Sequence, residues 1–172
     1  MITFSFKKIT KDHLPLMHKW YNLRHVLRWY SKKPLDYSRL EKKYRGYISG
    51  EYKIYGFICY LNKNPIGYIQ YYPASEYFTD RKILRSPIDR TAGIDLFIGE
   101  KSYIGKGFGK LMLLRFLRRH VFPYFEYCVV DPEKKNKKAL KAYKSCGFLK
   151  VGSTHSEAGE PQDLLVKRKQ SL

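Results

Sequence analysis

The stretch that decides the fold is GIDLFIGEKSYIGKGFGKLM, residues 93–112. Its first half has the alternation of a β-strand, because side chains along a strand point in turn to opposite faces. One face carries Ile94, Leu96 and Ile98, and the other carries Asp95 and Phe97. We therefore predict a strand with a carboxylate in its middle.

The second half is a glycine-rich turn, with Gly105, Gly107 and Gly109 in front of the amphipathic helical segment KLMLLRFLRRH, residues 110–120. A turn of this kind between a strand and a helix exposes backbone N–H groups at the positive end of the helix dipole. It therefore predicts a site for an anion such as a phosphate. The alternative is a glycine-rich connector that serves packing alone.

Two well-known phosphate-binding patterns do not match this turn. GxxxxGK[ST] would need glycine where Ile104 stands, and Leu111 replaces its Ser or Thr. In GxGxxG the third glycine would fall on Lys110 or on Met112. A mononucleotide triphosphatase and a dinucleotide-binding Rossmann enzyme are therefore disfavoured.

The rest of the chain predicts an α/β domain with a mixed sheet and this strand, glycine turn and helix at its centre. Before the turn we expect helices over 11–30 and 35–49, the second ended by Gly46 or Gly50. These are followed by an antiparallel hairpin over 52–74, with its turn at 62–65, and by a loop over 75–90. After it we expect the helix 110–120, a strand over 125–132, a helix from Asn136 ended by Gly147, and closing strands over 148–154 and 163–169.

Length and composition limit the class of protein. The 172 residues fit a single domain, 1–172, and the formal net charge of +19 favours anionic partners. The absence of a long apolar run and of a signal-type N-terminus predicts a cytoplasmic protein with no membrane partner. The three cysteines form no CxxC pair, so we expect buried thiols and no metal.

The glycine turn, read together with DPEKKNKKALKAYKSCGF at 131–148, resembles the GNAT superfamily of N-acetyltransferases. In that family the loop R/Q-x-x-G-x-G/A holds the pyrophosphate of coenzyme A, and an Asn and a Tyr of the next helix face the pantetheine and the thiol. The match falls on the three glycines of the turn, Asn136 and Tyr143, while the R/Q position falls on Ile104. The resemblance implies a GNAT-like, mostly antiparallel sheet flanked by helices, and acetyl-CoA as co-substrate.

Within this superfamily the chain resembles the aminoglycoside 6′-N-acetyltransferases and siderophore-type acetyltransferases. HKWYNLRHVLRWY at 18–30 is similar to the W-x-N-x-x-H-[IV]-x-x-W segment of that group. The step of ten residues from Asp95 to Gly105 and the D-P-x-x-x-N spacing are also similar. The resemblance implies a small-molecule amine as acceptor, with an aminoglycoside 6′-amine as the leading candidate.

The resemblance also implies roles for individual residues. The catalytic residues would be Asp95, which orients or deprotonates the substrate ammonium, and Tyr143, which donates a proton to the sulfur. The cofactor-binding residues would be Phe97, Ile98, Gly105, Lys106, Gly107, Phe108, Gly109, Lys110 and Asn136, with backbone N–H groups after Phe97 or Ile98 polarising the thioester carbonyl. The substrate-binding residues would be Trp20, Asp95, Asp131 and Glu160.

Each of these roles has a structural alternative. Trp20 and Tyr143 lie at helical spacings typical of core residues. Asn136 has the position of a helix N-cap, and Asp131 that of a turn-forming Asp-Pro. Asp95 could be a surface carboxylate on an exposed strand face.

The charge of the chain bears on the choice of substrate. An aminoglycoside is a polycation, which a protein of charge +19 repels unless an acidic pocket acts within a Debye length of about 8–10 Å. Candidates for such a pocket are Asp95, Asp131, Glu76, Asp80, Glu157, Glu160 and Asp163.

Several acceptors and one different class of function therefore stay open. A siderophore precursor, a polyamine or a protein N-terminus are alternative acceptors. A basic, non-catalytic module that binds nucleic acid is the alternative of a different class. The chain could act as a monomer or as a homodimer.

Overall fold

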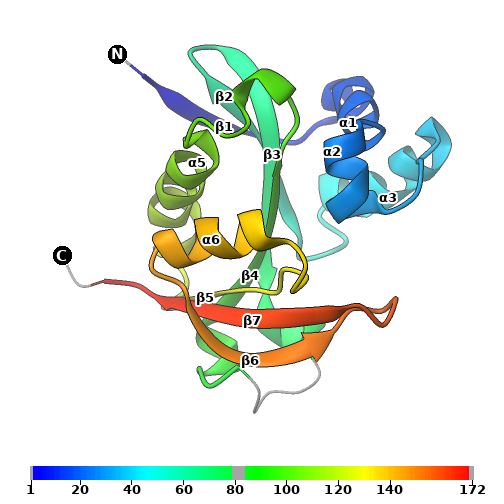
Figure 1. The fold of residues 1–172 in the computed structure, drawn as a ribbon. Coiled ribbons are helices and arrows are strands. Elements are labelled where there is room, and N and C mark those ends of the chain that lie inside the picture. The colour runs from blue at the N-terminus through cyan, green and yellow to red at the C-terminus, as the bar shows by residue number, and fades with distance from the viewer. Residues whose placement is uncertain (1, 79–83, 171–172) are drawn as a thin grey trace. The chain divides into compact units, whose positions relative to one another are not determined.

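The computed structural model describes residues 2–78 and 84–170 (Figure 1). The strands are β1 Phe4–Lys8, β2 Tyr55–Leu61, β3 Asn64–Pro73, β4 Thr91–Ile98, β5 Tyr127–Val130, β6 Leu149–His155 and β7 Pro161–Arg168. The α-helices are α1 Leu14–Tyr21, α2 Arg24–Val26, α3 Tyr37–Ser49, α4 Ala74–Tyr77, α5 Phe108–Phe116 and α6 Lys137–Ser145. Short 3₁₀ turns occupy Lys11–His13, Ile88–Arg90 and Lys101–Tyr103, and π-helical turns Leu27–Ser31 and Leu117–Val121.

Hydrogen bonding between neighbouring strands gives the order β1-β2-β3-β4-β5-β7-β6. The pairs β1–β2, β5–β7 and β6–β7 are antiparallel, whereas β4 and β5 run parallel, from Thr91 opposite Tyr127 to Gly93 opposite Val129. The sheet is therefore mixed and mostly antiparallel, as the sequence predicted.

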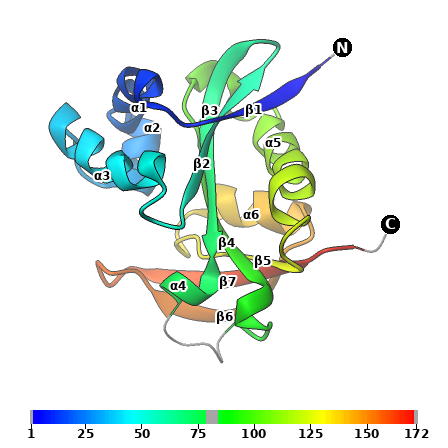
Figure 2. The same cartoon turned by 180° about the vertical axis from the view of Figure 1, so that it is seen from behind.

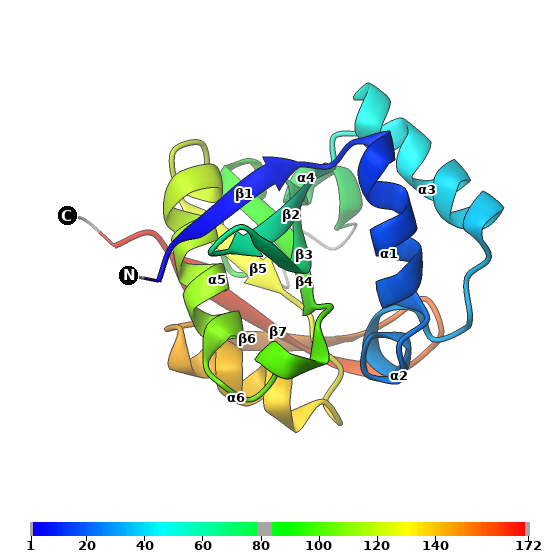
Figure 3. The same ribbon diagram turned by 90° about the horizontal axis from the view of Figure 1, so that it is seen from above.

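The chain divides into two compact units, residues 1–70 with 95–109 and residues 71–94 with 110–172. In the first unit, α1, α2 and α3 lie next to one another and beside the strands β1 and β2 (Figures 1 and 3). Their buried faces form an aromatic-rich core with the strands, which includes Trp20, Tyr21, Tyr44, Tyr68 and Phe97. Burial of such large side chains supplies most of the free energy that holds helices on a sheet.

In the second unit α6 lies over β7 and β5 in Figure 1, and α4 appears near β7 in the view from behind (Figure 2). Ala74 of α4 packs with Val129 of β5 and with Leu164 and Val166 of β7. Because side chains alternate along a strand, Cys128 and Leu165 point to the opposite face, and both are fully buried. Strands buried on both faces explain the continuous apolar run LLV at 164–166.

The N-terminal helices and the hairpin confirm the predicted pattern. The second helix ends at Gly50, which has a φ of 82°, while Gly46 lies inside α3 and is buried. A Cβ on Gly46 would lie 2.3 Å from the ring of Tyr52, so this glycine serves close packing. The hairpin turn is formed by Asn62 and Lys63, both at positive φ, as a tight two-residue turn requires.

The three cysteines are buried, as predicted, and none of them forms a disulfide with another. Burial raises the pKa of Cys59 to about 12, because a thiolate there would lose its hydration. This side chain therefore behaves as a small apolar core residue.

Two elements differ from the sequence-based prediction. Strand β1 was not predicted, and it pairs with β2 from Phe4 opposite Leu61 to Lys8 opposite Phe57. The segment 75–90, expected to be a loop, contains the end of α4 and the turn Ile88–Arg90, with Asp80 outside the described residues. Among the described helices, none is long and apolar enough to cross a membrane.

Candidate active site

The glycine turn adopts the backbone conformation that the sequence suggested. Gly105 and Gly107 have φ values of 78° and 80°, a left-handed region that favours glycine. A Cβ at either position would meet nothing within 4 Å, so the backbone conformation, and not close packing, selects glycine here. Helix α5 begins at Phe108, one residue after this pair. The turn therefore presents backbone N–H groups beside a helix N-terminus, the arrangement that binds phosphates.

Side chains of the turn divide into anchors and exposed cations. The ring of Phe108 packs with Tyr103 and with Phe4 of β1, at centroid distances of 5.6 and 6.4 Å. Lys106 and Lys110 are exposed. Phe108 thus anchors the turn to the first unit, while the two ammonium groups remain accessible to an anion.

Asp95 of β4 is held by a chain of hydrogen bonds from the neighbouring strand. The amide Nε2 of Gln70 donates to Asp95 Oδ2 at 2.8 Å, and the Tyr68 hydroxyl donates to Gln70 Oε1 at 2.8 Å. Gln70 is only 6% exposed, whereas Asp95 is half-buried. The carboxylate is therefore oriented by a buried amide and partly removed from water.

Gln70 was missed by sequence reasoning. The signal was present, because Tyr68 and Gln70 alternate with apolar residues in GYIQYY and must share one face of β3. What the sequence does not contain is the pairing that puts this face against Asp95.

Four tyrosine rings gather in the core that Asp95 adjoins. Tyr44 packs edge to face against Tyr21 and against Tyr68, at centroid distances of 6.2 and 5.7 Å. Tyr30 packs edge-on against Tyr21 at 5.5 Å. Burial raises the pKa of all four phenols, and the charge of Asp95 raises it further in Tyr21, Tyr30 and Tyr68. The hydroxyls thus remain protonated at neutral pH and can donate hydrogen bonds.

A lysine ammonium lies among these rings. Lys43 of α3 donates from Nζ to the hydroxyl of Tyr21 at 3.2 Å. Its Nζ lies 5.2, 5.7 and 5.8 Å from the ring centroids of Tyr21, Tyr30 and Tyr44. Although the residue as a whole is exposed, desolvation of its ammonium lowers the pKa of Lys43, and the negative charge of Asp95 opposes this shift.

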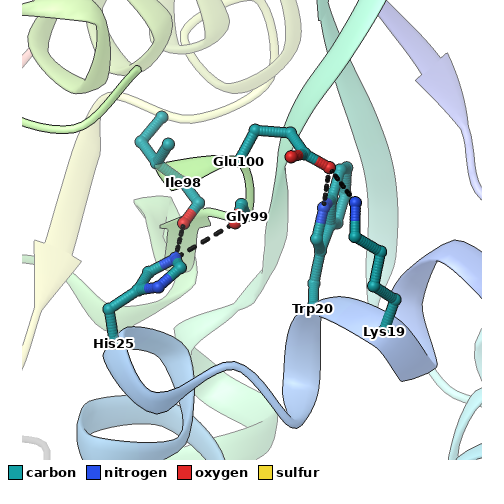
Figure 4. A network of polar contacts seen from close by, with 6 residues as sticks. All are labelled: Lys19, Trp20, His25, Ile98, Gly99 and Glu100. Atoms are coloured by element: carbon teal, nitrogen blue, oxygen red, sulfur yellow. Dashed lines mark hydrogen bonds and ion pairs between the residues drawn. The ribbon is translucent and has the colours of Figure 1, made fainter. Parts of the chain in front are cut away.

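Trp20, predicted as a substrate-binding residue, lies in the hydrophobic core. Its side chain is fully buried and packs edge-on against Phe97 at 6.1 Å. The indole Nε1 donates to Glu100 Oε1 at 2.8 Å, and Lys19 Nζ donates to the same oxygen at 2.8 Å (Figure 4). A Cβ on Gly99 would lie 2.2 Å from the indole. The structure therefore assigns Trp20 to the core and corrects the predicted substrate contact.

The end of β4 is also satisfied within the chain. His25 Nε2 lies 3.1 Å from the carbonyl oxygen of Ile98 and 3.0 Å from that of Gly99, so this nitrogen is the protonated donor (Figure 4). The N–H of Gly99 donates to the carbonyl of Ile66 at 2.8 Å. The N–H that follows Ile98 is thus occupied within the chain and is not available to polarise a thioester carbonyl. The N–H that follows Phe97, the other predicted donor, stays a prediction. The side chain of Phe97 is 8% exposed and belongs to the core.

In the second unit, α6 carries the two other residues of the predicted cofactor and catalytic set. Asn136 is the N-cap of the helix, and its Oδ1 accepts from the N–H of Ala139 at 3.2 Å. Tyr143 is half-buried and packs edge to face on Phe148 at 5.6 Å. Asn136 and Tyr143 are seven residues apart, so they share one face of the helix.

Of three acidic residues in the second unit, Asp131, Glu160 and Asp163, one has a raised pKa and two are paired with lysines. Burial raises the pKa of Asp131, which is half-buried at the end of β5. Glu160 accepts from Lys135 Nζ at 2.7 Å, and Asp163 from Lys150 Nζ at 2.8 Å. Of these three, Glu160 and Asp163 are thus largely neutralised by lysines, which weakens the acidic pocket that the sequence suggested.

Comparison with known proteins identifies the family. The family model described as an acetyltransferase (GNAT) domain matches residues 10–155. The chain belongs to the GNAT acetyltransferase family. It is therefore an N-acetyltransferase, and acetyl-CoA is its acetyl donor. The backbone N–H groups and exposed lysines of the glycine turn fit the anionic end of this co-substrate.

Three similar proteins place this GNAT acetyltransferase among known relatives. An aminoglycoside N(6′)-acetyltransferase type 1 of Klebsiella pneumoniae is 25% identical over 179 residues, which covers 98% of this chain and 84% of the relative. The crystal structure of aminoglycoside acetyltransferase AAC(6′)-Ib with coenzyme A is 22% identical, with a TM-score of 0.86 and coverage of 98% and 96%. A structure of AAC(6′)-Ib with coenzyme A and kanamycin is 24% identical, with a TM-score of 0.84 and the same coverage. The two structures show that this chain has their fold.

A metal centre was not expected for this acetyltransferase. Within residues 2–78 and 84–170, no group of three or more His, Cys, Asp or Glu side chains is arranged to hold a metal ion.

Proposed function

We propose that this GNAT acetyltransferase transfers acetyl to an amino group of a cationic small molecule, and that an aminoglycoside 6′-amine is the leading acceptor. The observation that carries the proposal is Asp95, a half-buried carboxylate oriented by the buried amide of Gln70 through a hydrogen bond of 2.8 Å. Such a group attracts an ammonium more strongly than an exposed carboxylate does, because less water screens it. The names of the relatives support the choice of aminoglycoside.

Each proposed role rests on one chemical property. Asp95 binds the substrate ammonium and takes up one of its protons, which leaves a neutral amine as nucleophile. Acetyl-CoA supplies the acetyl group as a thioester. The Tyr143 hydroxyl gives a proton to the sulfur as the thiol departs, and the N–H groups at Gly105 and Gly107 hold the pyrophosphate.

The remaining residues of the predicted set have supporting roles in this proposal. Lys106 and Lys110 attract the phosphates, and Asn136 combines helix capping with a contact to the pantetheine. Asp131 contacts a second ammonium of the acceptor, while Glu160 reaches the acceptor only when it releases Lys135. The proposal also includes one acetyltransferase domain, a cytoplasmic location where acetyl-CoA is made, and a contribution to antibiotic resistance.

The test is release of free thiol from acetyl-CoA in the presence of candidate amines. Kanamycin, spermidine, a hydroxylamine and a short peptide with a free N-terminus represent the four acceptor classes. We expect the highest kcat/KM for kanamycin, and mass spectrometry should show acetyl on its 6′-amine. A higher kcat/KM for another class would move the assignment to that class.

The alternative of a nucleic-acid-binding module is tested separately. It requires retention on DNA or RNA at low salt and a steep loss of affinity as salt increases. We expect acetyl-CoA to raise the melting temperature of the protein, whereas a DNA duplex should not change thiol release. Stabilisation by nucleic acid without stabilisation by acetyl-CoA would favour the alternative.

A further inference from the structure

Lys43 has surroundings of a kind that proteins use to bind ammonium ligands. Its Nζ lies within 6 Å of three ring centroids, those of Tyr21, Tyr30 and Tyr44, and donates to one phenol. Rings at this distance attract a cation through their electron-rich faces, and cages of aromatic rings recognise ammonium groups. The three tyrosines, here called the tyrosine cage, therefore form an ammonium site that the chain itself occupies.

The tyrosine cage adjoins the carboxylate with the proposed role in amine binding. The negative charge of Asp95 acts on Lys43 as well as on Tyr21 and Tyr30. Tyr68, which packs on Tyr44, begins the hydrogen-bond chain through Gln70 to Asp95. All these residues belong to the first unit. An ammonium held near Asp95 would thus be attracted by both the tyrosine cage and the carboxylate.

The ammonium group of Lys43 is held weakly enough to leave the tyrosine cage. Its ammonium makes one hydrogen bond, of 3.2 Å, besides the three ring contacts, and the residue as a whole is exposed on α3. The long, flexible stem lets the ammonium move into water, where its lost hydration is restored. Two ammonium groups in the cage would repel each other at short distance, so occupancy is exclusive.

We propose that the tyrosine cage is the ammonium-recognition site of this enzyme, and that Lys43 is a built-in competitor which a cationic acceptor displaces. The proposal rests on the proposed function, because it concerns how the acceptor amine is recognised. Lys43 then sets specificity: only acceptors with enough positive charge or enough additional contacts replace its ammonium. Removal of the Lys43 charge should relax this selection.

The first experiment compares acceptor kinetics of Lys43→Met with those of the wild type. The methionine keeps an unbranched apolar stem and removes the charge, so the exposed position tolerates it. We expect the KM for kanamycin to fall about 3- to 10-fold, because a competing ammonium held by cation–π interactions is lost. The kcat should stay unchanged. Lys42→Met removes the same charge from the neighbouring position of α3 and should leave KM and kcat unchanged. An unchanged or higher KM in Lys43→Met would overturn the proposal.

The second experiment does not depend on activity. Trace acetylation of the wild-type protein with acetic anhydride, followed by peptide mass mapping, measures the accessibility of each lysine. Tetramethylammonium, which has no reactive N–H, should enter the cage and raise the labelling of Lys43 several-fold over sodium chloride of equal ionic strength. Labelling of Lys42 should not change. Equal labelling of Lys43 in both salts would overturn the proposal even if the enzyme acetylates amines, whereas thiol release from no tested amine would overturn the proposed function alone.

Discussion

Gln70 donates its amide N–H to Asp95 across 2.8 Å, and the two side chains lie on adjacent strands of the sheet. The donor is itself fixed, since the carbonyl oxygen of Gln70 accepts the hydroxyl of the fully buried Tyr68. Asp95 therefore has one oxygen bound by a rigid donor. A buried chain of this kind orients the carboxylate before any substrate arrives, which lowers the reorganisation needed in a reaction.

Asp95→Asn is expected to lower kcat/KM for the acceptor by about 10²- to 10⁴-fold, the usual contribution of a positioned general base. The amide can still accept the hydrogen bond from Gln70, so we expect the melting temperature to stay within a few degrees of the wild type. Thiol-release kinetics and a thermal melt measure the two effects. Stabilisation by acetyl-CoA should persist. Full turnover in this variant would show that Asp95 has no catalytic role.

Tyr143→Phe should reduce kcat by about 10²-fold, the lower end of general acid catalysis, because a thiolate leaves more readily than most groups. The ring contact with Phe148 is kept, so the stability of the protein should hardly change. The measurement is kcat at saturating acetyl-CoA and acceptor. Tyr124→Phe is a suitable control, since Tyr124 is 75% exposed. Equal kcat values for the two variants would remove Tyr143 from the proposed mechanism.

Gly105→Ala and Gly107→Ala should each raise the KM for acetyl-CoA. An alanine forced into the left-handed region costs about 1–2 kcal/mol, so the turn would relax and misdirect its N–H groups. Gly159→Ala introduces the same strain, because Gly159 has a φ of 78° and open space around its Cα. This control should lower stability by a similar amount without changing the KM for acetyl-CoA. A parallel effect of all three variants on that KM would contradict a specific role for the turn.

The contacts of Glu100 predict a pH-dependent contribution to stability. Hydrogen bonds from Lys19 and Trp20 lower the pKa of Glu100, so the carboxylate stabilises the folded state at neutral pH. This contribution is lost as the pH falls through the lowered pKa of the folded state. The melting-temperature difference between the wild type and Glu100→Gln should therefore be largest near pH 7 and disappear in acid.

Comparison of two variants separates the charge of Glu100 from its acceptor oxygen. Glu100→Gln keeps an oxygen for the Trp20 indole and should cost at most about 1 kcal/mol, the value of a partly exposed ion pair. Glu100→Leu leaves the buried N–H of Trp20 without its acceptor and should cost about 1–3 kcal/mol. Denaturant melts at pH 7 measure both. Equal costs for the two variants would show that the ion pair with Lys19 dominates, because both substitutions remove it.

Added salt should change kcat/KM in opposite directions for the two substrates, kanamycin and acetyl-CoA. At +19, the protein repels a polycation and attracts acetyl-CoA, and the Debye length falls from about 30 Å at 0.01 M salt to about 8 Å at 0.15 M. Over this range we expect kcat/KM to rise for kanamycin and to fall for acetyl-CoA. Steady-state kinetics in sodium chloride measure both. A decrease for both substrates would indicate that a local acidic surface outweighs the net charge.

Local signals in the sequence predicted most of the elements. Neighbours within a few residues decide three kinds of feature that the structure has. These are the strand alternation around Asp95, the helix caps at Asn136 and Gly50, and the hairpin turn at Asn62. Strand β1 escaped prediction because its five residues are too few for a clear period. Its partner residues lie 49 to 57 positions further along the chain, from Lys8 opposite Phe57 to Phe4 opposite Leu61, so the pairing with β2 leaves no local trace.

The candidate site shows the same limit. Gly105 and Gly107 were found because a left-handed backbone needs glycine locally. The Tyr68–Gln70–Asp95 chain and the place of Lys43 depend on contacts between segments far apart in the sequence. Trp20 was misassigned for the same reason, since helical spacing alone does not distinguish a core indole from a pocket wall.

The distribution of tryptophan has an optical consequence. Both indoles, Trp20 and Trp29, lie in the first compact unit, and the second unit contains tyrosine as its only strongly fluorescent side chain. Trp20 is fully buried, whereas Trp29 lies partly exposed, with Arg28 and Lys32 over its ring. Indole emission excited at the red edge of the absorption band therefore reports the first unit alone. Comparison of this signal with backbone circular dichroism distinguishes cooperative unfolding of the whole chain from separate melting of its halves.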